Sequence, residues 1–138
     1  MDIKPGIKDS EDAVIMPEIK GKVEFKNVTF GYDKKQTVLE NVSFTVKERE
    51  TVALVGPTGA GKTTIINLIS RFYETSKGKV LIDGMDVTKV TLESLRSQLG
   101  IMLQDTFLFS GTVKDNIRYG RLDASDEEII EAAKAVCA

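Results

Sequence analysis

Two segments near the start of the chain alternate apolar and polar residues, a pattern typical of half-buried β-strands. The first covers residues 23–30 and the second residues 42–46, with the turn sequence Asp33-Lys34-Lys35 between them. Strands that present one apolar face are usual in antiparallel sheets. We therefore expect these two segments to form an antiparallel pair.

A third segment, Thr51–Val55, is apolar along its length and runs directly into a glycine-rich stretch. Such a run predicts a strand covered on both faces, in the middle of a sheet. After the glycines, Ile65, Leu68, Ile69 and Phe72 recur at the spacing of one helical face. The pattern predicts a strand, a glycine loop and a helix in direct succession.

Shorter patterns follow in the second half of the chain. The sequence predicts a strand over residues 79–83, a short helix over residues 92–99 and a strand over residues 101–103. Ser125 followed by Glu128 forms a capping box, which predicts the start of a helix that continues through Val136.

Residues 1–20 contain Pro5, Gly6 and Pro17 and a charged run over residues 8–12, and few of them are apolar. This composition favours a linker. We expect the folded part to span residues 21–138, which is the size of one domain or of part of one.

The composition excludes several classes of function. The 138 residues carry 19 Lys and Arg against 21 Asp and Glu, a net charge of −2 with both signs spread along the chain, so we expect no nucleic-acid partner. A content of 41% hydrophobic residues predicts a globular core, and no apolar run approaches the roughly twenty residues of a membrane helix. The absence of histidine excludes a histidine base, and the single Cys137 excludes an internal disulfide.

Residues 56–63 match the phosphate-loop pattern G-x-x-x-x-G-K-[ST]. Glycines let successive backbone N–H groups surround a phosphate, and the following helix directs its positive end at the same anion. In such a loop Lys62 reaches the β- and γ-phosphates, and the Thr63 hydroxyl is a ligand for Mg²⁺. The alternative is a glycine-rich turn beside an exposed lysine, but the predicted strand and helix on either side favour the phosphate loop. The predicted nucleotide-binding residues of this segment are Gly56, Pro57, Thr58, Gly59, Ala60, Gly61, Lys62, Thr63 and Thr64.

From about Gly21 to Ala138 the chain resembles the nucleotide-binding domain of ATP-binding cassette (ABC) transporters, and most closely the exporter branch. Besides the loop, the matching segments are residues 21–25, 30–32, 38–44, 81–84 and 103–109. The resemblance implies an α/β fold in which an N-terminal antiparallel β-subdomain precedes a P-loop NTPase core. It also implies ATP and Mg²⁺ as ligands.

The resemblance assigns roles to three further residues. Tyr32 lies at the position of the aromatic residue that stacks on adenine, Val38 lies in a matching nucleotide-binding segment, and Gln104 matches the glutamine that contacts Mg²⁺ and the attacking water. The alternatives are an ordinary aromatic at a strand end for Tyr32 and a solvated turn residue for Gln104. Lys62 and Gln104 are thus the expected catalytic residues, and Thr63 and Gln104 the expected metal ligands.

Two further segments, residues 80–83 and residues 107–109, each allow two interpretations. Residues 80–83 imitate the apolar strand that ends in the Mg²⁺-binding Walker B aspartate, but Gly84 follows where a glutamate is expected, so we interpret Asp83 as a turn residue. Residues 107–109, Phe-Leu-Phe, are expected to pack in a small core. The resemblance also places them where a membrane domain docks.

The family's signature sequence, Walker B strand, catalytic glutamate and switch histidine would lie after Ala138. The expectation is thus an N-terminal part of the domain, truncated before the Walker B strand and inactive on its own. In the complete domain, ATP hydrolysis would power export, with a second nucleotide-binding domain, identical or not, and a membrane-spanning domain as partners at the cytoplasmic side of the cell membrane. The alternatives are a non-catalytic nucleotide-binding or interaction fragment and a soluble P-loop ATPase of another type.

Overall fold

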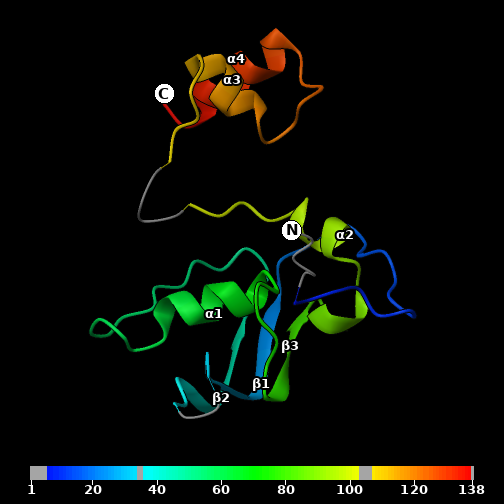
Figure 1. Ribbon diagram of the computed structural model, residues 1–138, viewed down its shortest axis with the longest axis vertical. Helices are drawn as coiled ribbons and strands as arrows, with labels where there is room; N and C mark the ends of the chain where they lie inside the picture. Colours follow the sequence, from blue (N-terminus) through cyan, green and yellow to red (C-terminus); the bar gives the residue numbers. More distant parts are fainter. Residues whose placement is uncertain (1–5, 34–35, 103–106, 138) are drawn as a thin grey trace. The chain divides into compact units, whose positions relative to one another are not determined.

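The computed structural model describes residues 6–33, 36–102 and 107–137, which divide into a first unit up to Gly100 and a second unit from Ile101. The first unit contains a β-sheet with the helices α1 and α2 and a short 3₁₀ helix, and the second contains the helices α3 and α4 (Figure 1).

Among the described residues, the sheet of the first unit has four antiparallel strands in the order β2-β1-β3-β4. Their bounds are Val23–Phe30 for β1, Leu39–Val46 for β2, Lys77–Ile82 for β3 and Met85–Asp86 for β4. The predicted antiparallel pair of β1 and β2 is confirmed, with Phe25 opposite Phe44 and their rings stacked at 4.6 Å.

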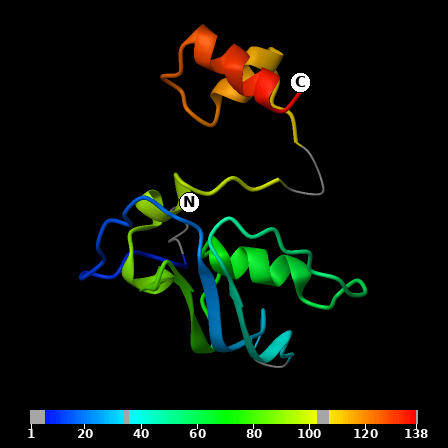
Figure 2. The ribbon, with the colours of Figure 1, turned by 180° about the vertical axis from the view of Figure 1, so that it is seen from behind.

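The core of the first unit is formed by residues from this sheet, from the helices α1, Lys62–Ile69, and α2, Leu92–Arg96, and from the segments around them. Figure 2 shows the ribbon of the sheet and of the helices from behind. Phe25 and Val28 from the sheet, Leu68 from α1 and Leu95 from α2 are all at most 2% exposed. Because Thr64 in the first turn of α1 and Leu68 in its last turn are both buried, the helix is held in a defined position relative to the sheet.

Helix α1 is shorter than the apolar spacing predicts. It ends at Ile69 with Ser70 as its C-cap, because Arg71 adopts the left-handed conformation with φ +51°. Phe72 therefore leaves the helical face and is 46% exposed, with the Arg96 guanidinium 4.7 Å from its ring centroid.

Part of the predicted linker makes defined contacts with the first unit. Met16 is 3% exposed and donates its backbone N–H to Ser94 Oγ at 2.8 Å, and Val14 forms a β-bridge with Val90. The buried Arg71 donates to the carbonyl oxygens of Val90 and Lys8, both at 3.0 Å.

The prediction of a buried strand at Thr51–Val55 is wrong for this structure. These residues have no strand assignment, and every one of them is exposed, with Val55 at 93%. A strand needs a hydrogen-bonded neighbour, and the sheet that the structure describes contains only β1 to β4. Residues 101 and 102 of the other predicted strand are likewise exposed and unassigned, and residue 103 lies outside the described residues.

The second unit consists of α3, Val113–Arg118, and α4, Asp126–Ala135. The capping box predicted at Ser125 and Glu128 is confirmed. Helix α3 was not predicted, although Thr112 and Asp115 form a capping box of their own.

The expected packing of residues 107–109 is not found within the described residues. Phe107 and Leu108 are each 76% exposed, and Phe109 is 47% exposed while its ring lies 4.5 Å from that of Tyr119. A unit of two short helices has too little apolar surface to bury them. None of the helices described in either unit is long and apolar enough to cross a membrane.

Candidate functional site

The loop before α1 owes its shape to two glycines in the left-handed region, Gly59 with φ +84° and Gly61 with φ +86°. The amide of Ala60 donates to the carbonyl oxygen of Pro57 at 3.2 Å and closes the turn. A Cβ at Gly61 would lie 2.7 Å from Leu39 Cδ2, so the Leu39 side chain would have to shift to admit it. The left-handed backbone conformation is therefore the main reason that glycine is favoured at this position.

The N-terminus of α1 is open to an anion. Its N-cap is Gly61, which provides no side-chain acceptor, and no acidic residue lies in its first turn. By contrast, Thr112 and Ser125 cap the N-termini of α3 and α4. First-turn amides without partners and the positive end of the helix dipole together favour a bound phosphate at α1.

Lys62, the first residue of α1, folds back over this loop. Its ammonium donates hydrogen bonds to the carbonyl oxygens of Gly56 and Pro57, both at 2.8 Å. The positive charge thus lies beside the same backbone whose amides would surround a phosphate. A phosphate oxygen is a stronger partner for an ammonium than a neutral carbonyl, so these bonds can be exchanged for bonds to an anion.

The two threonines after Lys62 differ in their surroundings. Thr63 is exposed, whereas Thr64 is 4% exposed, and its Oγ1 lies 3.0 Å from the hydroxyl oxygen of Tyr32. This hydrogen bond joins the aromatic residue after β1 to the first turn of α1. The structure therefore brings Tyr32 close to the glycine loop, although the loop begins at Gly56, 24 residues later in the sequence.

Tyr32 remains 51% exposed although its ring has two aromatic neighbours. The ring centroid of Phe30 lies 5.0 Å away at an interplanar angle of 84°, and that of Tyr73 lies 4.9 Å away at 88°. Asn67 of α1 also donates to the Tyr32 hydroxyl at 3.4 Å. Neither Asn67 nor Tyr73 is predicted from the sequence. Asn67 lies three positions after Thr64 and so on the same helical face, whereas no sequence pattern marks Tyr73.

Val38 lies beside the loop as well. Its amide donates to the carbonyl oxygen of Phe30 at 2.8 Å, and its Cγ1 would be 3.5 Å from a Cβ on Gly61. Val38 thus lies next to Gly61, and Tyr32 lies next to Thr64, so both are adjacent to the predicted nucleotide-binding segment. Gln104, the remaining predicted site residue, lies outside the described residues.

The described residues contain no group of three carboxylate, histidine or cysteine side chains that could hold a metal ion by themselves. The exposed hydroxyl of Thr63 offers a single oxygen ligand. This donor set fits Mg²⁺, which commonly keeps several waters and takes further ligands from substrate phosphates.

Asp83 is a turn residue, as predicted, and it has a structural role. It has φ +50°, and its carboxylate accepts hydrogen bonds from the backbone amides of Lys20, Gly21 and Lys22 at 2.7, 3.3 and 2.8 Å. Burial raises the pKa of Asp83, but these backbone hydrogen bonds together hold the pKa below its ordinary value. The carboxylate of Asp83 thus fixes the backbone of residues 20–22.

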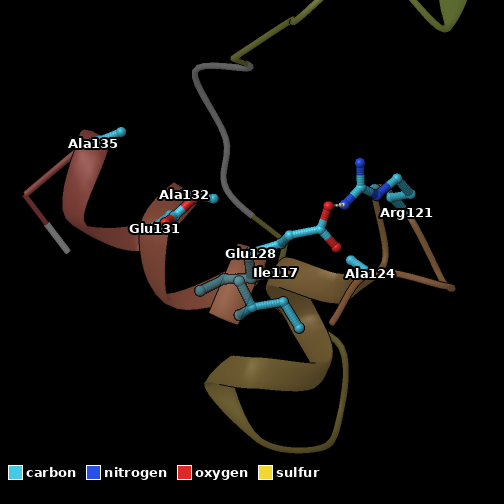
Figure 3. A pocket seen from close by; sticks show the side chains of 9 residues that line it. Ile117, Arg121, Ala124, Glu128, Glu131, Ala132 and Ala135 are labelled. Atoms are coloured by element: carbon cyan, nitrogen blue, oxygen red, sulfur yellow. Dashed lines mark ion pairs between the residues drawn. The ribbon is translucent and has the colours of Figure 1, made fainter. Parts of the chain in front are cut away.

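A different hollow, of about 560 Å³, lies in the second unit between α3 and α4. Figure 3 shows the side chains that line it. Ile117, Ala124 and Ala132 are among the residues that line it, and its charged pair, Arg121 and Glu128, is joined by an ion pair. Because the two charges satisfy each other, this hollow offers no cation for a phosphate. The loop before α1 remains the candidate site.

Known proteins show which family the chain resembles. A family model described as ABC transporter matches residues 39–137. The chain is 54% identical over 134 residues to the uncharacterized ABC transporter ATP-binding protein YfiC of Bacillus subtilis (strain 168). The aligned region covers 97% of this chain and 22% of YfiC.

The chain is also 55% identical over 113 residues to the mitochondrial iron-sulfur clusters transporter ATM1 of Debaryomyces hansenii. The aligned region covers 82% of this chain and 16% of ATM1. Among solved structures, a bacterial Atm1-family ABC exporter with ATP bound is similar with a TM-score of 0.89 and 46% identity. That match covers 93% of this chain and 22% of the exporter chain. The chain thus spans about a fifth of the length of the relatives it matches.

Proposed function

The chain belongs to the ABC transporter family, and we propose that it binds ATP together with Mg²⁺ at residues 56–64, as the ATP-binding part of an exporter. The observation that carries the proposal is the position of Lys62, whose ammonium lies over a glycine loop at the uncapped N-terminus of α1. The similar exporter structure with ATP bound supports the identity of the ligand.

In this proposal each residue acts through the chemistry of its own side chain. The Lys62 ammonium exchanges its hydrogen bonds to the carbonyl oxygens of Gly56 and Pro57 for hydrogen bonds to the β- and γ-phosphates. The Thr63 hydroxyl is a ligand of Mg²⁺, which neutralises charge on the phosphates when it is bound. Tyr32 offers its exposed ring to the adenine, with Val38 beside it.

In the complete domain the same residues would serve ATP hydrolysis. Phosphoryl transfer to water depends on positioning and on stabilisation of developing charge, which Lys62 supplies to the transferred group. We propose that Gln104 contacts Mg²⁺ and the attacking water. We further propose that the 138-residue chain alone is inactive as an ATPase.

Export, the partner domains and the location belong to the whole protein, of which this chain is a part. We propose that a second nucleotide-binding domain and a membrane-spanning domain complete the transporter at the cytoplasmic side of a membrane. Among the relatives, ATM1 is named for iron-sulfur clusters, whereas YfiC is uncharacterized.

Calorimetric titration of the chain with ATP in the presence of Mg²⁺ tests the proposal. We expect saturable binding that ADP competes for, because ADP retains the adenine and the β-phosphate. Absence of binding to a folded chain, with the fold verified by circular dichroism, would overturn the assignment.

A further inference from the structure

Three aromatic rings form a cluster at the candidate site. Phe30 ends β1, Tyr32 follows it, and Tyr73 comes from the loop after α1. Tyr32 lies nearly perpendicular to both neighbours, at 84° to Phe30 and 88° to Tyr73, and the centroids of Phe30 and Tyr73 are 5.6 Å apart. Edge-to-face pairs at these distances are attractive beyond simple burial.

The Tyr32 side chain is fixed at its far end as well. Its hydroxyl is 3.0 Å from Thr64 Oγ1 and accepts from Asn67 Nδ2 at 3.4 Å. The ring is therefore restrained by its two aromatic neighbours and at its hydroxyl group, while the residue as a whole stays 51% exposed. An exposed tyrosine without such restraints would exchange between rotamers, and a ligand that stacks on it would have to order it first.

We infer that Tyr73 is a positioning residue of the nucleotide site, which holds the Tyr32 ring in place for the nucleobase before the nucleotide arrives. This inference rests on the proposed function. It assigns to Tyr73 no contact with the nucleotide: Tyr73 acts through Tyr32. Its effect must therefore be confined to the part of the affinity that comes from the base.

The experiment compares two ligands, ATP and inorganic tripolyphosphate, each with Mg²⁺, by calorimetry on the full chain. Tripolyphosphate tests the phosphate loop alone, and the ratio of its dissociation constant to that of ATP reports the contribution of the nucleoside. The variants are Tyr73→Ala, Tyr73→Phe, Tyr32→Ala and the double variant Tyr32→Ala/Tyr73→Ala. Phe72→Ala is the matched control, since Phe72 is the neighbouring aromatic residue, is 46% exposed against 43% for Tyr73, and contacts Arg96 instead.

We expect Tyr73→Ala to weaken ATP binding by about 2- to 10-fold, the equivalent of one aromatic pair, and to leave tripolyphosphate binding unchanged. Tyr73→Phe should retain the affinity for ATP, because the edge-to-face contact needs only the ring. In the Tyr32→Ala background, Tyr73→Ala should add no further loss. Phe72→Ala should leave the ratio of the two dissociation constants as in the original chain.

Several outcomes would overturn the inference. They are an equal loss of ATP and tripolyphosphate affinity in Tyr73→Ala, an additive loss in the double variant, or unchanged ATP affinity in Tyr73→Ala. Thermal unfolding of each variant separates a loss of fold from a loss of positioning. If the original chain binds neither ligand, the proposed function fails; if it binds both and Tyr73→Ala has no selective effect, only the role of Tyr73 fails.

Discussion

The Nζ atom of Lys62 lies 2.8 Å from the carbonyl oxygen of Gly56, the first residue of the glycine loop. Together with the Pro57 carbonyl at the same distance, this contact keeps the ammonium at the loop when no ligand is present. A flexible lysine in solvent would have to lose rotamer freedom on binding phosphate, and here part of that freedom is already lost. The loop is thus prepared for an anion before one binds.

The first prediction concerns this ammonium. Lys62→Ala should weaken ATP binding by roughly 10- to 150-fold, because a charge-assisted hydrogen bond is worth about 1.5 to 3 kcal/mol. The measurement is calorimetry with Mg²⁺ present. Lys79→Ala is a suitable control, since Lys79 is an exposed lysine of β3 outside the loop. Equal affinities of the original chain and Lys62→Ala would contradict the role of Lys62.

The second prediction concerns the ring of Tyr32. Tyr32→Ala should cost about 1 to 3 kcal/mol of ATP binding, because a base stacked on an aromatic ring contributes that much. Tyr32→Phe should cost much less, because it keeps the ring face and loses only the hydrogen bonds of the hydroxyl group with Thr64 and Asn67. GTP should be tolerated to a similar extent, since stacking does not distinguish the two purines. The same affinity in all three proteins would identify Tyr32 as an ordinary aromatic at a strand end.

The local elements of the fold could be predicted from the sequence because local chemistry determines them. Ser125 and Glu128 form the predicted capping box, and the glycines of the loop adopt the backbone angles that the motif requires. The antiparallel pair of β1 and β2 follows from alternation alone. In each case the information lies within a few neighbouring residues.

Features that depend on distant partners could not be predicted in this way. Thr51–Val55 has the composition of a buried strand, but a strand forms only beside a neighbour, and the described sheet provides none for it. Tyr73 joins the candidate site only because α1 ends at Ile69 and the chain turns back toward β1. Neither the missing neighbour nor the return of the chain leaves a periodic signal in the sequence.

The third prediction concerns Asp83, whose carboxylate holds three backbone amides at the start of β1. Because its pKa is lower in the folded chain than in the unfolded chain, its contribution to stability is fully present above about pH 4. That contribution is lost as the pH falls through the lower, native pKa. Asp83→Asn, which keeps one acceptor oxygen and tolerates the positive φ, should destabilise the chain by roughly 1 kcal/mol at neutral pH.

Denaturant unfolding at a series of pH values checks this prediction. The difference in stability between the original chain and Asp83→Asn should shrink as the pH falls below about 4, since the original carboxyl group then becomes neutral too. Asp123→Asn, at an exposed aspartate of the second unit, controls for the loss of one negative charge. A difference that stays constant with pH would show that the hydrogen bonds to Asp83 do not depend on its charge.

The last prediction concerns the apolar segment that the sequence assigned to a buried strand. Val55 is 93% exposed and Met102 95% exposed, and no strand of the described sheet pairs with Thr51–Val55. An exposed apolar segment with unpaired backbone groups favours association with another copy of itself. We therefore expect the 138-residue chain to self-associate as its concentration rises.

Val55→Lys should suppress this association, because a lysine on an exposed strand edge opposes pairing. Each contact between two copies would bury one Val55 side chain, and the loss of that burial costs about 1.5 to 3 kcal/mol. The concentration at half-association should therefore rise roughly 10- to 150-fold. Val136→Lys makes the same chemical change at a valine that is 74% exposed beyond the end of α4, and it should have little effect. Sedimentation velocity over a concentration series distinguishes these cases: a chain that stays monomeric throughout, or equal shifts in both variants, would show that Thr51–Val55 is not the contact.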